Sequence, residues 1–188
     1  LLHSVAGLPE DLLQRVHLLV IGQDNPRQFQ RQAKSLGVAE RFTIHKGRDD
    51  IPAVLQGADL MVHPAYMESG GMVLIEAVIA GLPVIASGAC GFAHYIEDAD
   101  AGIVLPEPFV QSDLDNAVIG ALRDAAERVR WSANGIAFGR QHQELYDMPD
   151  QAMGIIESYL QRRRSVEGEL GVDDGEAGSA RFTAEQSP

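Results

Sequence analysis

Five short apolar runs recur along the chain, separated by longer segments with helical spacing. The runs are His17–Ile21, Arg41–His45, Leu60–Val62, Val84–Ala86 and Gly102–Leu105. Strands of a parallel sheet that is covered on both faces have such near-continuous apolar sequences, whereas half-exposed strands alternate apolar and polar residues. Each run therefore predicts a short, buried, parallel strand.

The segments between the runs carry the signals of helices. Pro26 opens one such segment and Gly37 closes it. The apolar residues of this segment share one face: Phe29, Ala33 and Leu36. Further helical segments are expected at Leu1–Ala6, Ile51–Gly57, Met72–Ala80, Phe92–Ile96, Asp113–Ala126, Arg128–Gln141 and Pro149–Arg163. The alternation predicts an α/β fold, a Rossmann-like parallel sheet with helices on both faces, followed by C-terminal helices.

The composition changes after Arg163. Residues 165–188 hold six carboxylates, many small residues and a single aromatic side chain, Phe182. Such a segment buries too little apolar surface to offset the chain entropy that is lost on folding. We therefore divide the chain into a Rossmann-like domain at residues 1–163 and an acidic disordered tail at residues 164–188.

Charge and cysteine content narrow the possible partners and compartments. The net charge of −12 argues against nucleic acid as a partner and against a membrane anchor in this part. The single cysteine, Cys90, excludes an internal disulfide and fits the reducing cytoplasm. The sequence shows no apolar run of bilayer length, no signal peptide and no metal-ligand spacing among its histidines. Because the chain opens with Leu1 instead of methionine, we expect it to be part of a larger enzyme.

The candidate chemistry lies at His63–Pro83, where a loop at Ala65–Gly71 runs into the helix at Met72–Ala80. A helix start has free backbone N–H groups and a partial positive charge, so it favours an anion such as phosphate. Gly70 and Gly71 stand at this start and allow a ligand to approach the backbone closely. The stretch therefore predicts an anion site.

Two carboxylates flank this anion site, Glu68 before the turn and Glu76 within the helix. The combination suits a ligand that is part phosphate and part sugar. The apolar sequence neighbours of Glu76 predict a partly buried carboxylate that needs partners. From the pattern alone, ribose binding and an ordinary helix glutamate are equally good interpretations of Glu76, and a solvated loop carboxylate is the commoner fate of Glu68. A glycosidase pair is disfavoured, because helical spacing separates the two residues by ~12 Å and glycosidase carboxyls lie ~5–9.5 Å apart.

Ligands of open parallel sheets bind beyond the C-terminal ends of the strands. Four loops follow the predicted strands there: Gly22–Asp24, Gly47–Asp49, His63–Gly71 and Ser87–Gly91. We expect these loops to converge on one edge. Asp24 and Asn25 are interpreted as turn formers that cap the next helix, and Cys90 as a packing residue.

Glu68 and Glu76, separated by seven residues, resemble the donor-site motif of the retaining glycosyltransferases of family 4. The resemblance continues in GQDNPRQFQ from Gly22, GRDDI from Gly47, HPAYMESGGMVLIEA from His63 and CGFAHYI from Cys90. Together these segments are similar to the bacterial glucosyltransferases that add the first glucose to the heptose region of the lipopolysaccharide core. The similarity covers roughly Leu18–Leu160.

The resemblance implies a function. The chain is expected to be the nucleotide-sugar-binding, C-terminal half of a GT-B enzyme, truncated at its N-terminus, that transfers glucose from UDP-glucose with retention. Glu68, as the catalytic residue, would hold hydroxyls of the transferred hexose near the reacting carbon. Donor binding is assigned to Glu76 at the ribose, to the backbone of Ser69, Gly70, Gly71 and Met72 at the diphosphate, to Val73 beside it, and to Gly47 and Arg48 near the base. Neither a metal nor a cofactor besides the UDP-sugar is expected.

Some positions depart from the family pattern. His94 stands where many relatives have the glutamate of a Gly-Gly-x-x-Glu turn, and nothing before Leu1 supplies the Arg and Lys that hold the diphosphate in relatives. We therefore expect this chain alone to lack transferase activity and to bind UDP weakly. The lipopolysaccharide acceptor would bind through the missing N-terminal domain, and the full-length protein would associate peripherally with the cytoplasmic face of the inner membrane.

Other interpretations stay open. Arg48 is otherwise a surface residue paired with Asp49 or Asp50. The same scaffold also serves a GDP-mannose-dependent mannosyltransferase, a nucleotide-sugar epimerase or a non-catalytic module that binds nucleotide sugars.

Overall fold

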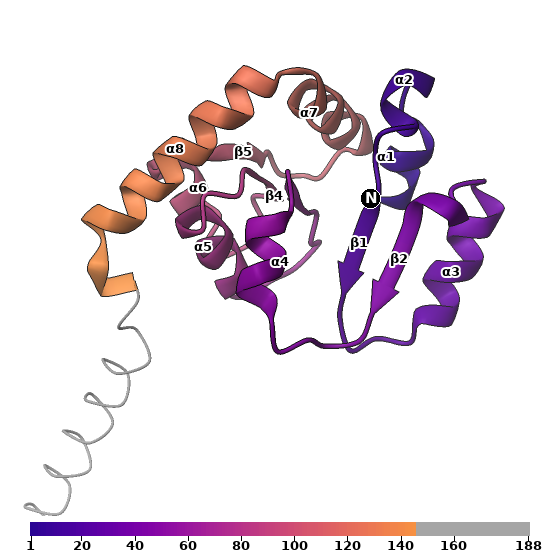
Figure 1. The fold of residues 1–188 in the computed structure, drawn as a ribbon, viewed down its shortest axis with the longest axis horizontal. Helices are drawn as coiled ribbons and strands as arrows, with labels where there is room; N and C mark the ends of the chain where they lie inside the picture. Colours follow the sequence, from indigo (N-terminus) through magenta and orange to yellow (C-terminus); the bar gives the residue numbers. More distant parts are fainter. Residues whose placement is uncertain (146–188) are drawn as a thin grey trace, which may run out of the picture. The chain divides into compact units, whose positions relative to one another are not determined.

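The computed structural model describes residues 1–145, in which strands and helices alternate (Figure 1). Three predictions lie outside the described residues: the helix at Pro149–Arg163, the domain boundary at residue 163 and the tail at residues 164–188. Within residues 1–145, no helix is long and apolar enough to cross a membrane.

All five predicted strands are present, and every pairing between them is parallel. The strands are β1 (Leu18–Ile21), β2 (Phe42–His45), β3 (Met61–His63), β4 (Val84–Ser87) and β5 (Gly102–Leu105). β1 pairs with β2, with Ile21 opposite His45, and β3, β4 and β5 form a second sheet in which His63 lies opposite Ala86. The predicted parallel α/β fold is confirmed, with its strands divided between two sheets.

The helices follow the predicted segments. They are α1 (Leu2–Ala6), α2 (Glu10–Leu13), α3 (Pro26–Ser35), α4 (Ile51–Gly57), α5 (Met72–Ile79), α6 (His94–Asp98), α7 (Gln111–Arg123) and α8 (Ala125–Gln141), with short 3-10 turns at Ala39–Arg41 and Gln143–Leu145. The sequence pattern does not predict α2 or the 3-10 turns, because an element of three or four residues is too short to show a helical period.

Local chemistry explains where α3 begins and ends. The Asn25 Oδ1 atom accepts a hydrogen bond from the backbone N–H of Arg27 at 3.1 Å, which confirms the predicted cap. Pro26 occupies the first turn, where its missing N–H has no intrahelical partner to lose. Beyond the helix, Gly37 adopts a left-handed φ of +74° and redirects the chain toward β2.

Two clusters of buried side chains lie on opposite faces of β4. Ile85 belongs to the cluster that contains Leu114 of α7, whereas Val84 and Ala86 belong to the cluster that contains Leu74 of α5. Successive residues of a strand point to opposite faces, so helices cover β4 on both sides. This arrangement is the predicted layer order.

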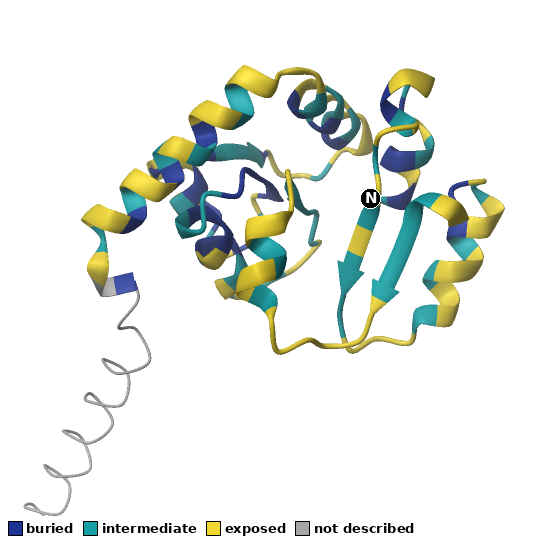
Figure 2. Cartoon of the chain, in the orientation of Figure 1, coloured by how far each residue is buried: buried dark blue, intermediate teal, exposed yellow. Residues whose placement is uncertain are grey.

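The two sheets differ in burial, as the colours along β1 and β2 show in Figure 2. Val84, Ile85 and Ala86 of β4 are fully buried, whereas Leu19 of β1 is 42% exposed. The prediction that His17–Ile21 forms a buried strand is therefore wrong, and it is also wrong for Arg41–His45 and Leu60–Val62, which contain no buried residue. Among the described strands, β1 has only β2 as a neighbour, which leaves its other edge without a covering strand.

Helix α8 packs directly on α5. The contact is close because Gly135 of α8 has no side chain: a Cβ atom there would lie 2.3 Å from the carbonyl oxygen of Val78 in α5. No other residue permits such an approach of two helix backbones. The α5 helix is thus in contact with both α8 and β4.

Candidate functional site

The start of α5 has the features of an anion site. Gly71 precedes the helix in a left-handed conformation with φ +94°, which glycine adopts without strain. The first turn of α5 contains no acidic residue, and no side chain caps it. Its N–H groups and the positive end of the helix dipole therefore stay available to a negatively charged ligand.

The Glu68 side chain passes beside this helix start. A Cβ atom on Gly71 would lie 3.5 Å from the Glu68 Cγ atom and 3.3 Å from the Leu74 Cδ1 atom. The Glu68 Oε1 atom accepts a hydrogen bond of 3.3 Å from the backbone N–H of Gly70. The structure thus brings the predicted catalytic carboxylate and the predicted diphosphate site together in one loop, of which Ser69 is an exposed member.

The loop that carries Glu68 is attached to the end of β4. The Ser87 hydroxyl, fully buried, donates a hydrogen bond of 2.5 Å to the carbonyl oxygen of Ala65. Glu68 and Cys90 form an isolated parallel β-bridge. The sequence pattern predicts that Ser87–Gly91 is one of four loops at the edge, but it does not predict that this loop holds the Glu68 loop. A serine at the end of an apolar strand is a signal for such a role, because a buried hydroxyl needs a partner.

Cys90 itself is a buried packing residue, as predicted. Burial raises the pKa of the Cys90 thiol above its usual value, and the Ser87 hydroxyl lies 3.8 Å from its sulfur atom. A thiol with a raised pKa stays protonated at neutral pH and is a poor nucleophile.

Glu76 differs from its prediction, because its side chain is exposed instead of partly buried. Leu74, Ile75, Ala77 and Val78 are the buried residues of α5. A rotation of about 100° per residue turns Glu76 away from its apolar sequence neighbours. Glu76 instead shares the exposed face with Met72, four residues earlier, and helix side chains lean toward the helix N-terminus. Glu76 thus lies on the exposed face of α5, about one turn from the helix start.

Arg48 lies in the loop after β2 and forms a surface ion pair. Its Nε and Nη2 atoms donate hydrogen bonds of 2.6 and 2.5 Å to the two carboxylate oxygens of Asp50. The Arg48 guanidinium lowers the pKa of the Asp50 carboxyl below its usual value. The alternative interpretation of Arg48 as a paired surface residue therefore describes this structure. Gly47, beside it, is exposed, and Val73 is half-buried on α5.

The four loops at the strand ends form two pairs. A Cβ atom on Gly47 would lie 2.4 Å from the Gln23 Nε2 atom, so the loops after β1 and β2 touch. The Ser87–Ala65 hydrogen bond joins the loops after β3 and β4. The expected convergence of loops thus holds within each parallel sheet, as the strand pairings require.

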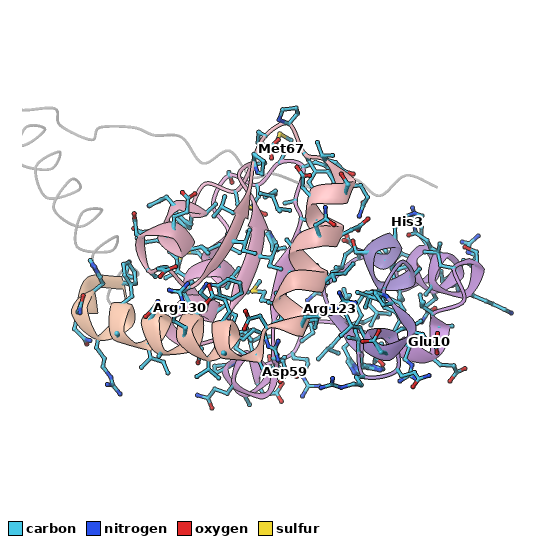
Figure 3. All side chains as sticks on the ribbon, turned by 90° about the horizontal axis from the view of Figure 1, so that it is seen from above. His3, Glu10, Asp59, Met67, Arg123 and Arg130 are labelled. Carbon is cyan, nitrogen blue, oxygen red and sulfur yellow. The ribbon has the colours of Figure 1, made fainter. Side chains whose placement is uncertain are left out.

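Two further features mark the rim of the β3–β4 pair. Among the residues that the structure describes, the His63 Nε2 atom at the end of β3 is buried without a hydrogen-bond partner. Buried polar atoms seldom stay unpaired, so a polar group of a ligand bound at this edge would supply the missing hydrogen-bond partner of His63. At the tip of the loop Met67 is 90% exposed and projects outward (Figure 3).

The chain matches a known protein family and several known proteins. Residues 1–138 match the family described as glycosyl transferases group 1. The chain is 42% identical over 155 residues to the lipopolysaccharide glucosyltransferase WaaG of Escherichia coli, covering 82% of this chain and 41% of that protein. It is 31% identical over 160 residues to the phosphatidyl-myo-inositol mannosyltransferase of Mycobacterium leprae, covering 85% of this chain and 41% of that protein.

Solved structures agree with these sequence matches. The crystal structure of WaaG, a glycosyltransferase involved in lipopolysaccharide biosynthesis, superposes with a TM-score of 0.79 at 42% identity, over 82% of this chain and 42% of that one. Anabaena Alr3699/HepE in complex with UDP-glucose superposes with a TM-score of 0.70 at 24% identity, over 84% of this chain and 44% of that one. At 24% identity, the second match shows only that the fold is shared. The chain spans about two fifths of the length of these relatives.

Proposed function

Because the chain belongs to the glycosyl transferases group 1 family, we propose that it is the donor-binding half of a retaining glucosyltransferase. In this proposal the enzyme transfers glucose from UDP-glucose to the heptose region of the lipopolysaccharide core, in the cytoplasm at the face of the inner membrane. The 42% identity to a lipopolysaccharide glucosyltransferase supports this substrate pair. The acceptor contacts are assigned to parts of the enzyme outside this chain.

The observation that carries the proposal is the uncapped start of α5 beside Glu68. Gly71 exposes the first turn, and no acidic side chain of that turn competes with an incoming phosphate. The diphosphate of a nucleotide sugar would bind there through the backbone N–H groups of Ser69, Gly70, Gly71 and Met72, with Val73 beside it. The neighbouring carboxylate of Glu68 then faces the sugar that is attached to the second phosphate.

The main catalytic work of such a site is electrostatic. As the glycosidic bond breaks, negative charge develops on the departing UDP. N–H groups that the folded backbone already aims at this position stabilise that charge without reorganising during the reaction. The transfer is proposed to need no metal, because the helix start supplies the positive charge.

Two carboxylates would read the sugars of the donor. Glu68 would accept hydrogen bonds from hydroxyls of the glucose, and its half-buried position beside Gly71 supports this role. Glu76 would accept hydrogen bonds from the two ribose hydroxyls, because it is exposed on the face of α5 that also carries Met72 at the helix start. Arg48 would border the base, for which it must exchange its contact with Asp50.

A different base or sugar is the nearest alternative. The 31% identity to a mannosyltransferase shows that a related chain can serve another sugar, while the higher identity to a glucosyltransferase favours glucose. Competition of UDP and GDP for the site separates the two, since the proposal requires UDP to bind more tightly.

The ribose assignment can be tested with Glu76→Gln in the protein as its gene encodes it. Removing the charge weakens two charge-assisted hydrogen bonds, and we expect UDP affinity to fall by about tenfold or more. Isothermal titration calorimetry with UDP measures this loss. Glu97→Gln, an exposed glutamate of α6, is the matched control and should bind like the wild type. Unchanged UDP affinity in Glu76→Gln would reject the assignment.

A further inference from the structure

We propose that Gly91 is a positioning residue for the donor sugar, because its missing side chain lets the segment Cys90–Phe92 pair with the loop Glu68–Gly70. This inference rests on the proposed function and deepens it. It assigns to a residue outside the two-carboxylate motif the task of fixing where the Glu68 carboxylate stands.

The pairing consists of backbone hydrogen bonds on both sides of Ser69. The Gly91 N–H donates to the carbonyl oxygen of Glu68 at 3.1 Å, and the Phe92 N–H donates to the carbonyl oxygen of Gly70 at 3.0 Å. Glu68 and Cys90 form the parallel bridge that these bonds extend. The Cys90–Phe92 segment therefore acts as a short extra strand for the loop and determines the path of its backbone.

Only glycine fits at position 91. A Cβ atom there would lie 2.3 Å from the Ser69 carbonyl oxygen and 3.1 Å from its carbonyl carbon. Gly91 does not have a left-handed φ, so backbone conformation is not the reason for glycine. Gly91 is also exposed, so a buried core is not the reason either. The requirement comes from the close approach of the Glu68 loop.

The Cys90–Phe92 segment is the firmly held partner of this contact. The Ala93 N–H donates to the Cys90 carbonyl at 3.0 Å, and the His94 Nδ1 atom lies 3.2 Å from the Gly91 carbonyl. The Phe92 ring lies 5.9 Å from the Tyr95 ring, which in turn lies against His94 and against Phe138 of α8. A side chain added at position 91 would therefore displace the Glu68 loop, because the added carbon collides at the backbone contacts that otherwise hold this loop in place.

Displacement of the loop should separate two parts of donor binding. Glu68 directly precedes Ser69, so a shift of the Ser69 carbonyl moves the carboxylate that faces the sugar. The first turn of α5 is held independently, because Leu74 is fully buried. UDP should therefore bind nearly as before, while the sugar is no longer held for reaction.

The test compares Gly91→Ala with Gly120→Ala in the protein as its gene encodes it. Gly120 lies in α7, and a Cβ atom there would meet nothing within 4 Å, so it is the matched control. Calorimetry gives the Kd of UDP, and a transfer assay with UDP-glucose gives kcat and KM. For Gly91→Ala we expect the UDP affinity to change less than about threefold and kcat to fall about 100-fold, the cost of a misplacement near 1 Å. Gly120→Ala should match the wild type in all three quantities.

Three results would overturn the inference. A kcat of Gly91→Ala near that of the wild type would show that the loop tolerates the added carbon. Equal losses of kcat and UDP affinity would show a general loss of structure. A wild-type-like kcat in Phe92→Leu would count against it too, because this variant keeps every backbone bond but removes the ring that lies beside Gly70 and against Tyr95, for which we expect a kcat loss of about tenfold.

If Gly91→Ala does not fold, the kcat of Phe92→Leu is the quantity that tests the inference. The failure of the proposed function would look different, because the wild type itself would then neither bind UDP nor transfer glucose.

Discussion

The loops after β3 and β4 are held far more firmly than the loops after β1 and β2. In the first pair, a fully buried Ser87 hydroxyl, the parallel bridge with its hydrogen bond from Gly91, and a backbone hydrogen bond from Phe92 fix the Glu68 loop. In the second pair, residues 45–50 are all exposed, and the Arg48–Asp50 ion pair lies at the surface. The firm pair belongs to the sheet with the buried strand β4, and the loose pair belongs to the sheet with the half-exposed strand β1.

This difference matches what the two halves of a nucleotide sugar require under the proposed function. A firmly held loop loses its conformational entropy on folding, so less is lost when the reacting diphosphate and sugar bind. A loose loop must order itself around the base, at a cost in affinity. Chemistry would then depend on the β3–β4 pair, and base selection on the β1–β2 pair. Measurements of stability can test whether the two pairs of loops differ in this way.

The largest effect is expected from the cores beneath the two pairs. Leu74→Ala empties a fully buried position and should lower the free energy of unfolding by about 2–5 kcal/mol. Leu19→Ala removes the same atoms from a residue that is 42% exposed and should cost about 1 kcal/mol or less. Urea unfolding with unchanged m-values measures both. Equal costs would mean that the two sheets are equally well packed, against the comparison.

An intermediate effect is expected from removing one side-chain hydroxyl group in each of the two sheets. Ser87→Ala leaves the Ala65 carbonyl without its partner in a buried place, which should cost about 1–3 kcal/mol. Thr43→Ala on β2 removes an exposed hydrogen bond of 2.7 Å to the His17 ring and should cost about 0.5 kcal/mol. The ranking can be read from urea midpoints. A larger loss of stability in Thr43→Ala than in Ser87→Ala would mean that the loops after β1 and β2, and not those after β3 and β4, are the more firmly held.

The smallest effect is expected from the Arg48–Asp50 ion pair, which lies in the loosely held loops after β1 and β2. Arg48 holds the pKa of the Asp50 carboxyl below its usual 3.8. A carboxyl with a depressed pKa adds stability that is fully present above the unfolded-state pKa and is lost as the pH falls through the folded-state value. Between about pH 5 and pH 3 the wild type should therefore lose slightly more Tm than Arg48→Gln does. Because both side chains are exposed, added salt should shrink this difference. Parallel Tm curves at low salt would show that the pair contributes nothing.

The sequence allowed much of the fold to be predicted. The helix Ile51–Gly57 and the strand Gly102–Leu105 have the same bounds in sequence analysis and in the structure, because glycine marks an end of each. Burial was predicted less well. Leu19 lies in an apolar run that reads as buried, yet burial depends on which strands become neighbours, and that is decided by contacts distant in sequence.

The candidate site shows the same division. Glu68 and Gly71 stand out in the sequence because carboxylates and glycines before a helix have a recognisable pattern. The predicted burial of Glu76 failed because sequence neighbours on a helix point in different directions. The backbone bonds from Gly91 and Phe92 could not be predicted, since any residue except proline can donate them and their partners lie more than twenty positions away.

The contact of Gly135 with the carbonyl of Val78 has a consequence for motion. Two helices whose backbones touch can neither slide past each other nor rotate about their own axes without collision. Helices α5 and α8 should therefore move as a single rigid unit. Under the proposed function, the helix start that would receive the diphosphate would then keep its shape whenever this unit moves.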